Sequence, residues 1–222
     1  MKKIGIVGSV FDKIFGVKIP YTSFFEQYGE VVILGPTVEV QDIDLLVLPG
    51  GLDVLSIRYN ENPNTRNTRV DPFLEWFDKK ILPLYIENQT PIIGLCRGFQ
   101  TLNIYFGGTI IQNLRGHEKN TYSRTDLVHS VSILDSYLTN GSVILVDEGV
   151  NSIHHQGVKM DNLAKILVPV AVKSKENKEN IVVTDIVEIF KHKTLPIWGL
   201  QYHPEEIYDN NSNEIIKYLL CL

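Results

Sequence analysis

The chain has 222 residues, a length that at roughly 100 to 200 residues per domain allows one α/β domain or a tight pair of domains. Hydrophobic residues make up 44% of the sequence and charged residues 21%, which excludes a disordered or fibrous chain. Because the net charge is −5, no general positive field exists to attract nucleic acid. Two cysteines, Cys96 and Cys221, are too few for a disulfide framework and indicate a reducing compartment.

The N-terminal segment predicts a strand rather than an export signal. It has a basic start and an apolar stretch, but Gly5 and Gly8 interrupt that stretch and no small-residue cleavage pattern follows. No run approaches the roughly 18 apolar residues that span a bilayer. We therefore expect a cytoplasmic protein with no membrane and no nucleic-acid partner.

Short apolar runs alternate with amphipathic stretches in the first half of the sequence. They predict strands over residues 3–7, 31–34, 45–48 and 91–95, and helices over residues 19–28, 72–81 and 98–106. Asp71 and Pro72 form a typical N-cap and first helical residue, and Pro83 should bend or end that helix. The alternation is typical of parallel strands joined by crossover helices.

The second half of the sequence is β-rich. Its apolar segments predict strands over residues 128–134, 143–146, 163–172, 181–190 and 197–202, followed by an amphipathic helix over residues 213–220. The polar stretches 60–68 and 173–180 are predicted to be loops and hairpin turns. None of these stretches has the character of a linker, so we expect one domain over residues 1–222.

The segment around Cys96 is the most informative part of the sequence. Residues 90–100 read T-P-I-I-G-L-C-R-G-F-Q, so an apolar strand runs into a turn where Gly94 and Gly98 flank the cysteine. This is the pattern of a nucleophile elbow, with cysteine in the place of serine. The N-terminus of the following helix would stabilise a thiolate, and the N–H of Arg97 would act as an oxyanion donor. An isolated cysteine is more often a buried structural residue, but this context favours a nucleophile.

A second segment, W-G-L-Q-Y-H-P-E-E at residues 198–206, places His203 and Glu205 two residues apart. In an extended chain such residues share a face, and Pro204 favours an extended His203. The imidazole could then take the thiol proton while the carboxylate orients its other nitrogen. Alone, this segment could equally be a strand end with solvated charges.

A third segment, L-V-L-P-G-G-L-D at residues 46–53, ends a buried strand in two glycines. Glycines let the backbone approach a ligand closely, so Gly50 or Gly51 could supply a second oxyanion donor. Arg58 and Arg69 are the nearest basic residues, and they could meet an acidic substrate, although arginines are more often solvated.

These three segments, in this order, resemble the class I glutamine amidotransferase superfamily, whose members carry a Cys-His-Glu triad. More of the sequence is similar to the γ-glutamyl-γ-aminobutyrate hydrolase family. The matching motifs are P-G-G-L-D-V at 49–54, G-L-C-R-G-F-Q at 94–100, G-G-T-I-I-Q-N-L at 107–114, N-S-I-H-H-Q at 151–156 and Q-Y-H-P-E at 201–205. The resemblance implies an α/β, flavodoxin-like three-layer fold with a mostly parallel central sheet and a β-rich C-terminal half.

The resemblance also implies roles for individual residues. Cys96 resembles the family nucleophile, His203 its base and Glu205 its orienter. Residues that resemble family positions around the glutamyl group are Gln100, Asn151, Ser152, His154, His155 and Gln156. Neighbouring strand residues point to opposite faces, so the two adjacent histidines do not predict a metal site. We expect neither a metal nor another cofactor.

The expected activity is hydrolysis of a γ-glutamyl amide by a cysteine nucleophile. The small-molecule substrate could be γ-glutamyl-γ-aminobutyrate, another γ-glutamylamine or a γ-glutamyl nucleotide amidate. Residues 11–28 form a shorter segment than in many family members, which leaves the choice open. Two alternatives are a glutaminase subunit that delivers ammonia to a separate synthase, and a non-enzymatic redox or chaperone-like relative. The oligomeric state also stays open, with a homodimer among the options.

Overall fold

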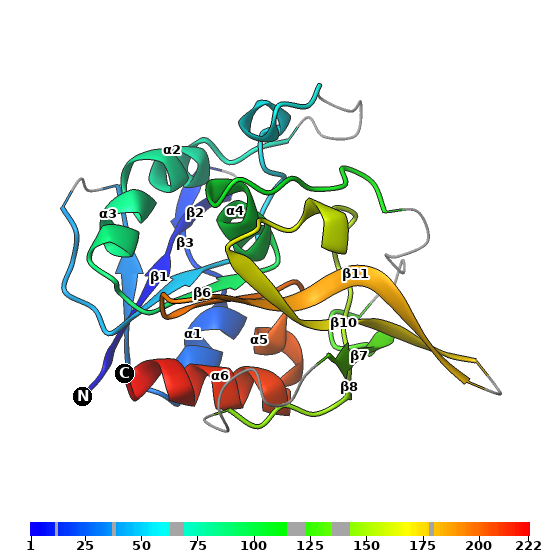
Figure 1. The fold of residues 1–222 in the computed structure, drawn as a ribbon. Helices are drawn as coiled ribbons and strands as arrows, with labels where there is room; N and C mark the ends of the chain where they lie inside the picture. The colour runs from blue at the N-terminus through cyan, green and yellow to red at the C-terminus, as the bar shows by residue number, and fades with distance from the viewer. Residues whose placement is uncertain (12, 37–38, 63–68, 115–122, 135–142, 178–179) are drawn as a thin grey trace.

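The structure is a computed structural model that describes residues 1–11, 13–36, 39–62, 69–114, 123–134, 143–177 and 180–222. Within these residues, ten strands form one sheet that joins both halves of the chain (Figure 1). The parallel part of the sheet runs in the order β4 (Glu30–Leu34), β1 (Lys3–Val7), β5 (Leu45–Leu48), β6 (Ile92–Leu95) and β12 (Ile197–Leu200). The carboxyl ends of β5, β6 and β12 therefore lie side by side.

The β-rich half of the chain continues the same sheet in antiparallel fashion. Its strands follow β12 in the order β11 (Asn180–His192), β10 (Leu167–Asn177), β7 (His129–Ile133) and β8 (Glu148–Val150), and β9 (Val158–Lys159) pairs with β11. A separate hairpin consists of β2 (Ser9–Phe11) and β3 (Ile14–Gly16). This hairpin follows β1 at the edge of the sheet where the site lies.

Helices cover both faces of the sheet (Figure 1). One face carries α2 (Pro72–Lys80), α3 (Leu82–Glu87) and α4 (Arg97–Tyr105), and the other carries α1 (Ile19–Phe25), α5 (Pro204–Ile207) and α6 (Asn210–Leu220). Two short 3-10 turns, η1 (Ser56–Tyr59) and η2 (Met160–Asn162), lie in the connections. Successive residues of β5 alternate between the two hydrophobic cores, with Leu46 in one and Leu45 and Val47 in the other. Both faces of this strand are buried, as a parallel sheet requires.

The predicted α/β fold with a mostly parallel central sheet and a β-rich C-terminal half is confirmed. Strands β1 and β5 have the predicted bounds, while α1 ends at Phe25, three residues before the predicted end. Helix α2 begins at Pro72 and is capped by Asp71, whose side chain accepts the N–H groups of Phe73 and Leu74. The next helix, α3, starts just before Pro83, so the predicted break occurs there.

The predicted strand over residues 143–146 is wrong. Instead, the N–H of Val146 donates to Asn211 Oδ1 at 2.8 Å, and Asn211 Nδ2 donates to the carbonyl of Val146 at 2.8 Å. A side chain of α6 thus takes both backbone groups that a neighbouring strand would otherwise pair. The strand of this region, β8, begins two residues later at Glu148.

Residues 173–180 were predicted to be loops and hairpin turns; the hairpin is confirmed, but a loop before Asn177 is wrong. Strand β10 continues to Asn177 and β11 starts at Asn180, with these two residues paired across the hairpin. Backbone pairing therefore extends the strands beyond their apolar residues. In the other predicted loop, residues 63–68 lie outside the described residues.

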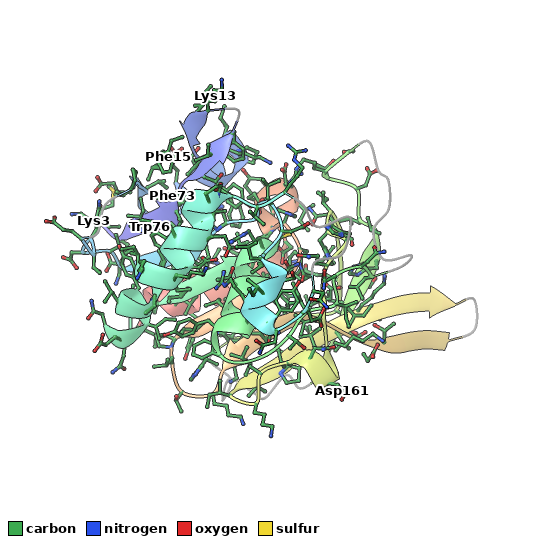
Figure 2. The ribbon with its side chains drawn as sticks, turned by 90° about the horizontal axis from the view of Figure 1, so that it is seen from above. Lys3, Lys13, Phe15, Phe73, Trp76 and Asp161 are labelled. Carbon is green, nitrogen blue, oxygen red and sulfur yellow. The ribbon has the colours of Figure 1, made fainter. Side chains whose placement is uncertain are left out.

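The hairpin β2–β3 was not predicted, because its few apolar residues do not form a regular pattern. Figure 2 shows Phe15 of this hairpin beside Phe73 of α2, and the two rings meet edge to face with centroids 4.9 Å apart. The N–H of Val10 also donates to Asp71 Oδ2 at 2.8 Å. Ring packing and a hydrogen bond thus fix the hairpin to the start of α2. None of the helices in the described part of the chain has the length and apolar character needed to cross a membrane.

Asp71→Ala is expected to lower the free energy of unfolding by about 1 to 2 kcal/mol, because it removes the cap of α2 as well as the hydrogen bond to Val10. Urea denaturation measures this change. Asp71→Asn keeps an acceptor oxygen and should lose less. Equal stability of the alanine variant and the wild type would show that the cap contributes nothing.

Candidate active site

Cys96 lies on the predicted strand-turn-helix, between β6 and α4. Its backbone has φ 49° and ψ −99°, a conformation that is costly for a residue with a side chain. The N–H of Cys96 donates to the carbonyl of Leu200 at 2.8 Å, which holds the turn against β12. A Cβ at Gly98 would lie 2.3 Å from the carbonyl oxygen of Leu48, so the helix can approach β5 only because this residue is glycine. The structure therefore has the geometry of a nucleophile elbow.

His203 and Glu205 lie together, but the geometry differs from the predicted extended chain. His203 is the residue before α5, and Glu205 lies in the first turn of that helix. His203 Nδ1 is 2.7 Å from Glu205 Oε1, and both residues are buried. The helix start, rather than a strand, brings the carboxylate under the imidazole.

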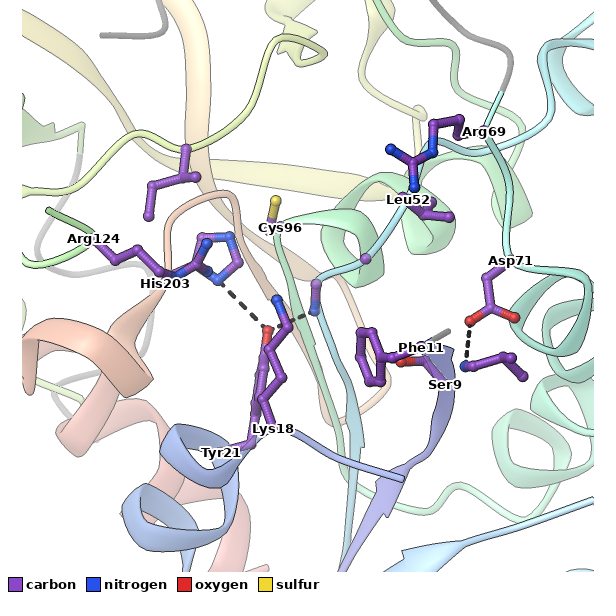
Figure 3. A pocket seen from close by; sticks show the side chains of 14 residues that line it. Ser9, Phe11, Lys18, Tyr21, Leu52, Arg69, Asp71, Cys96, Arg124 and His203 are labelled. Carbon is purple, nitrogen blue, oxygen red and sulfur yellow. Dashed lines mark hydrogen bonds between the residues drawn. The ribbon is translucent and has the colours of Figure 1, made fainter. Parts of the chain in front are cut away.

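Cys96 and His203 line one cavity, where Figure 3 shows their side chains next to each other. A Cβ at Gly50 would lie 2.6 Å from His203 Cε1 and 3.4 Å from Cys96 Cβ, so both side chains flank that glycine. Burial lowers the pKa of His203, but the negative charges of Glu205 and of the Cys96 thiolate, and hydrogen bonds to both, raise it to about 10. The imidazole is therefore protonated at neutral pH and can give its proton to a leaving group.

Tyr21 of α1 is a site residue that sequence reasoning missed. Its hydroxyl accepts the N–H of Gly50 at 2.8 Å and lies 3.5 Å from His203 Nδ1 (Figure 3). Tyr21 therefore contacts both the glycine turn after β5 and the imidazole of His203. Burial, followed by the charges of Glu205 and Cys96, raises the pKa of Tyr21 well above its usual value. A tyrosine on an amphipathic helix is usually a core residue, so no sequence signal distinguished it.

The predicted oxyanion donors differ in their surroundings. The N–H of Gly50 is already donated to Tyr21. Arg97 is the first residue of α4, so its N–H has no acceptor within the helix. Gly51 lines the cavity beside Cys96. Arg97 and Gly51 are therefore better placed than Gly50 to hold a developing oxyanion, and their role stays a prediction.

The six residues predicted to hold the glutamyl group do not line the cavity. Asn151 instead supports His203, because its Oδ1 accepts the N–H of His203 at 2.8 Å and its Nδ2 donates to the carbonyl of His203 at 3.0 Å. His155 Nε2 is 2.9 Å from Asp53 Oδ1 of the glycine loop, residues 49–53.

The remaining four predicted residues form a buried polar group. Gln100 donates to the carbonyl of Gln156 and to Gln201 Oε1, each at 3.3 Å. His154 Nδ1 lies 2.7 Å from the carbonyl of Gln156, and Ser152 Oγ lies 3.4 Å from His154 Nε2. These contacts connect α4 to residues 151–156. Within the described residues, no three His, Cys, Asp or Glu side chains form a group that could hold a metal ion.

The cavity has a volume of about 310 Å³ and a basic rim. Its lining residues are Ser9, Val10, Phe11, Lys18, Tyr21, Gly50, Gly51, Leu52, Arg69, Asp71, Cys96, Arg124, Ile153 and His203. Of the two arginines that the sequence analysis named as possible contacts of an acidic substrate, Arg69 lines the cavity. Arg58 does not, because its Nη1 lies 2.7 Å from Asp78 Oδ2 in the interior. The buried thiol of Cys96 therefore lies in a cavity that Lys18, Arg69 and Arg124 also line.

The chain matches the Peptidase C26 family over residues 35–205, well over half of its length. It therefore belongs to this family. The YvdE glutamine amidotransferase-like protein of Lactococcus lactis subsp. lactis is 28% identical over 232 residues, which cover 92% of this chain and 91% of the relative. A homolog of YvdE from Lactococcus lactis subsp. cremoris is 32% identical over 184 residues, which cover 72% of this chain and 96% of the relative.

Solved structures share the fold of this Peptidase C26 member. A GMP synthase component from Thermoplasma acidophilum has a TM-score of 0.64 at 21% sequence identity, with 100% of this chain and 93% of the other covered. The resemblance to the class I glutamine amidotransferase superfamily is confirmed. Membership of the narrower γ-glutamyl-γ-aminobutyrate hydrolase family stays a prediction.

The raised pKa of His203 predicts a pH dependence of stability. A pKa near 10 in the folded state, against roughly 6.5 in the unfolded state, gives stability that is complete below pH 6.5 and lost as the pH rises to 10. Between these values the free energy of unfolding should fall more in the wild type than in His203→Asn, by at least about 1.4 kcal/mol, the equivalent of one pKa unit. Urea denaturation of both proteins in reducing buffer measures the difference. Parallel curves would contradict a protonated His203.

Proposed function

We propose that this chain hydrolyses γ-glutamyl amides, with Cys96, His203 and Glu205 as its catalytic triad. The observation that carries the proposal is the arrangement of these side chains: Cys96, on its strained turn, lines the same cavity as His203, whose Nδ1 is 2.7 Å from Glu205 Oε1. Membership of the Peptidase C26 family supports a cysteine-dependent hydrolase. The γ-glutamyl specificity rests on the motif resemblance.

In the first step the sulfur of Cys96 attacks the γ-carbonyl carbon. The new C–S bond moves an electron pair onto the carbonyl oxygen, which the N–H groups of Arg97 and Gly51 hold. His203 gives its proton to the nitrogen as the C–N bond breaks, so the amine leaves and a γ-glutamyl thioester remains. Water then attacks the thioester while His203 takes one of its protons, and glutamate leaves as the thiolate returns. These steps use no cofactor.

The rim of the cavity favours a substrate whose amine half is negatively charged. Lys18 and Arg69 line the cavity, and neither pairs with a carboxylate among the described residues. The carboxylate of Asp71 also lines it, but this group accepts three backbone hydrogen bonds. Arg124 pairs with Glu206. The carboxylate of γ-glutamyl-γ-aminobutyrate or the phosphates of a nucleotide amidate therefore fit better than an uncharged amine.

The other two functions remain outcomes of the test. A glutaminase subunit would act weakly on glutamine by itself and faster when a synthase is added. The fold neighbour from Thermoplasma acidophilum, whose name makes it a subunit of a GMP synthase, is the reason to test this. A redox or chaperone-like protein would not need a carboxylate within hydrogen-bond distance of His203. The proposed hydrolase needs no partner protein.

Cys96→Ala is expected to lower glutamate release by at least about a thousand-fold, because the nucleophile is lost. The assay follows free glutamate from γ-glutamyl-γ-aminobutyrate, γ-glutamylmethylamide, a γ-glutamyl nucleotide amidate and glutamine. A matching thermal denaturation curve shows that the variant is folded. An alanine variant with wild-type turnover refutes the assignment of the nucleophile. A wild type that releases glutamate from glutamine but from none of the other three substrates favours the glutaminase subunit.

Lys18→Met should raise the KM for γ-glutamyl-γ-aminobutyrate about 3- to 10-fold, because it removes one partly exposed ion pair with the substrate. The KM for γ-glutamylmethylamide should not change, since its amine half carries no charge. Lys13→Met is the matched control, because Lys13 belongs to the same segment but does not line the cavity. An equal effect on both substrates would show that Lys18 does not contact the amine half.

A further inference from the structure

Four charged side chains form a buried cluster beside the nucleophile elbow, outside the cavity. They are Arg58 after the glycine loop, Glu75 and Asp78 on α2, and Arg97 at the start of α4. Their side chains are between 2% and 9% exposed, and the two positive charges balance the two negative ones. The steps proposed for catalysis use none of these side chains.

The side chain of Arg97 is held from two helices. Its Nη2 lies 2.9 Å from Glu75 Oε1 and 2.9 Å from Asp78 Oδ2. Its Nη1 donates to Thr101 Oγ1 at 3.2 Å, and this hydroxyl donates to Asp78 at 3.1 Å. Since Arg97 directly follows Cys96, these contacts fix the first turn of α4 to α2.

The same two carboxylates hold the chain that follows the glycine loop. Asp78 Oδ2 is 2.7 Å from Arg58 Nη1, and the N–H of Leu55 donates to Glu75 Oε1 at 3.3 Å. Glu75 Oε2 is also 3.5 Å from Arg58 Nη1. The two segments that provide the oxyanion donors thus share one anchor on α2.

Gly51 lies directly against the side chain of Arg97. A Cβ at Gly51 would be 3.2 Å from Arg97 Cδ and 3.0 Å from Leu74 Cδ1. A side chain at this position would be in tight contact with both groups. Gly51 therefore packs closely against the side chain of Arg97, whose guanidinium Glu75 and Asp78 hold.

We propose that Arg97 is a positioning residue which, held by Glu75 and Asp78, sets the spacing between the oxyanion donors of Gly51 and of its own backbone. This inference rests on the proposed function. Oxyanion donors act only when they lie about 2.7 to 3.1 Å from the developing charge, so a small displacement reduces turnover. Substrate binding would be little affected, because the interaction forms in the transition state.

Asp78→Asn tests the proposal, since it removes one charge of the anchor and keeps the shape of the side chain. Turnover per active site should fall at least about 10-fold with KM within about twofold, for the best γ-glutamyl amide and for p-nitrophenyl acetate. The rate of Cys96 alkylation by iodoacetamide should stay within about twofold. Alkylation at a saturated carbon forms no oxyanion, so it reports on the thiolate and His203 alone.

Two further variants separate positioning from general destabilisation. Asn211→Ala removes two partly buried hydrogen bonds to Val146, made by α6 on the face of the sheet opposite α2, and should lower the melting temperature without changing turnover per active site. Thr101→Val removes only the hydroxyl between Arg97 and Asp78 and should lower turnover about threefold. It tests the same anchor if Asp78→Asn does not fold.

The substrates distinguish the failure of this inference from the failure of the proposed function. A wild type that cleaves p-nitrophenyl acetate but no γ-glutamyl amide would refute the proposed function, and the ester rates would still test the anchor. Unchanged turnover in Asp78→Asn and Thr101→Val would overturn the inference. So would a loss of alkylation equal to the loss of turnover, because the effect would then lie in the triad.

Discussion

The backbone of Cys96 is the constraint on which the site depends. A residue with a side chain at φ 49° costs about 1 to 3 kcal/mol, and the surrounding packing must hold it there. The hydrogen bond to Leu200 and the close approach of Gly98 to Leu48 tie the turn to the strands on both sides of β6. The same turn directs the sulfur into the cavity and starts α4 beside it. Removing the strain would lose the nucleophile, the helix N-terminus and one oxyanion donor together.

The parts of the fold that the sequence predicted are those determined by local pattern. Apolar runs bounded by glycine or proline predicted the bounds of β1 and β5, because such strands are buried on both faces. Residues 143–146 have the same apolar character, but Asn211 of α6 occupies the backbone of Val146. No pattern within residues 143–146 encodes a competitor 65 residues away.

The residues of the candidate site were likewise predicted only where a local pattern in the sequence marks them. The glycines around Cys96 and the spacing of His203 and Glu205 are local features, and they predicted which residues meet. Tyr21 and His203 are 182 residues apart in the sequence. They meet because β1, which precedes α1, lies beside β5 in the sheet, so α1 comes close to the carboxyl ends of β5, β6 and β12. In the segment 151–156, Ile153 lines the cavity, whereas Asn151, which was expected to meet the substrate, binds the backbone of His203 instead. A motif therefore indicates proximity to a site more reliably than contact with the substrate.

The buried charges beside the elbow are not explained by stability alone. Removing four charges from water costs free energy that their mutual attraction often only balances, and apolar side chains of similar size often pack at least as well. What apolar contacts lack is direction. The hydrogen bonds of Arg97 to Glu75 and Asp78 each have a preferred length and angle, so they determine where the guanidinium lies, and Gly51 packs against the Cδ of the same side chain. A site that must place two N–H groups about one oxygen gains more from such direction than from additional burial.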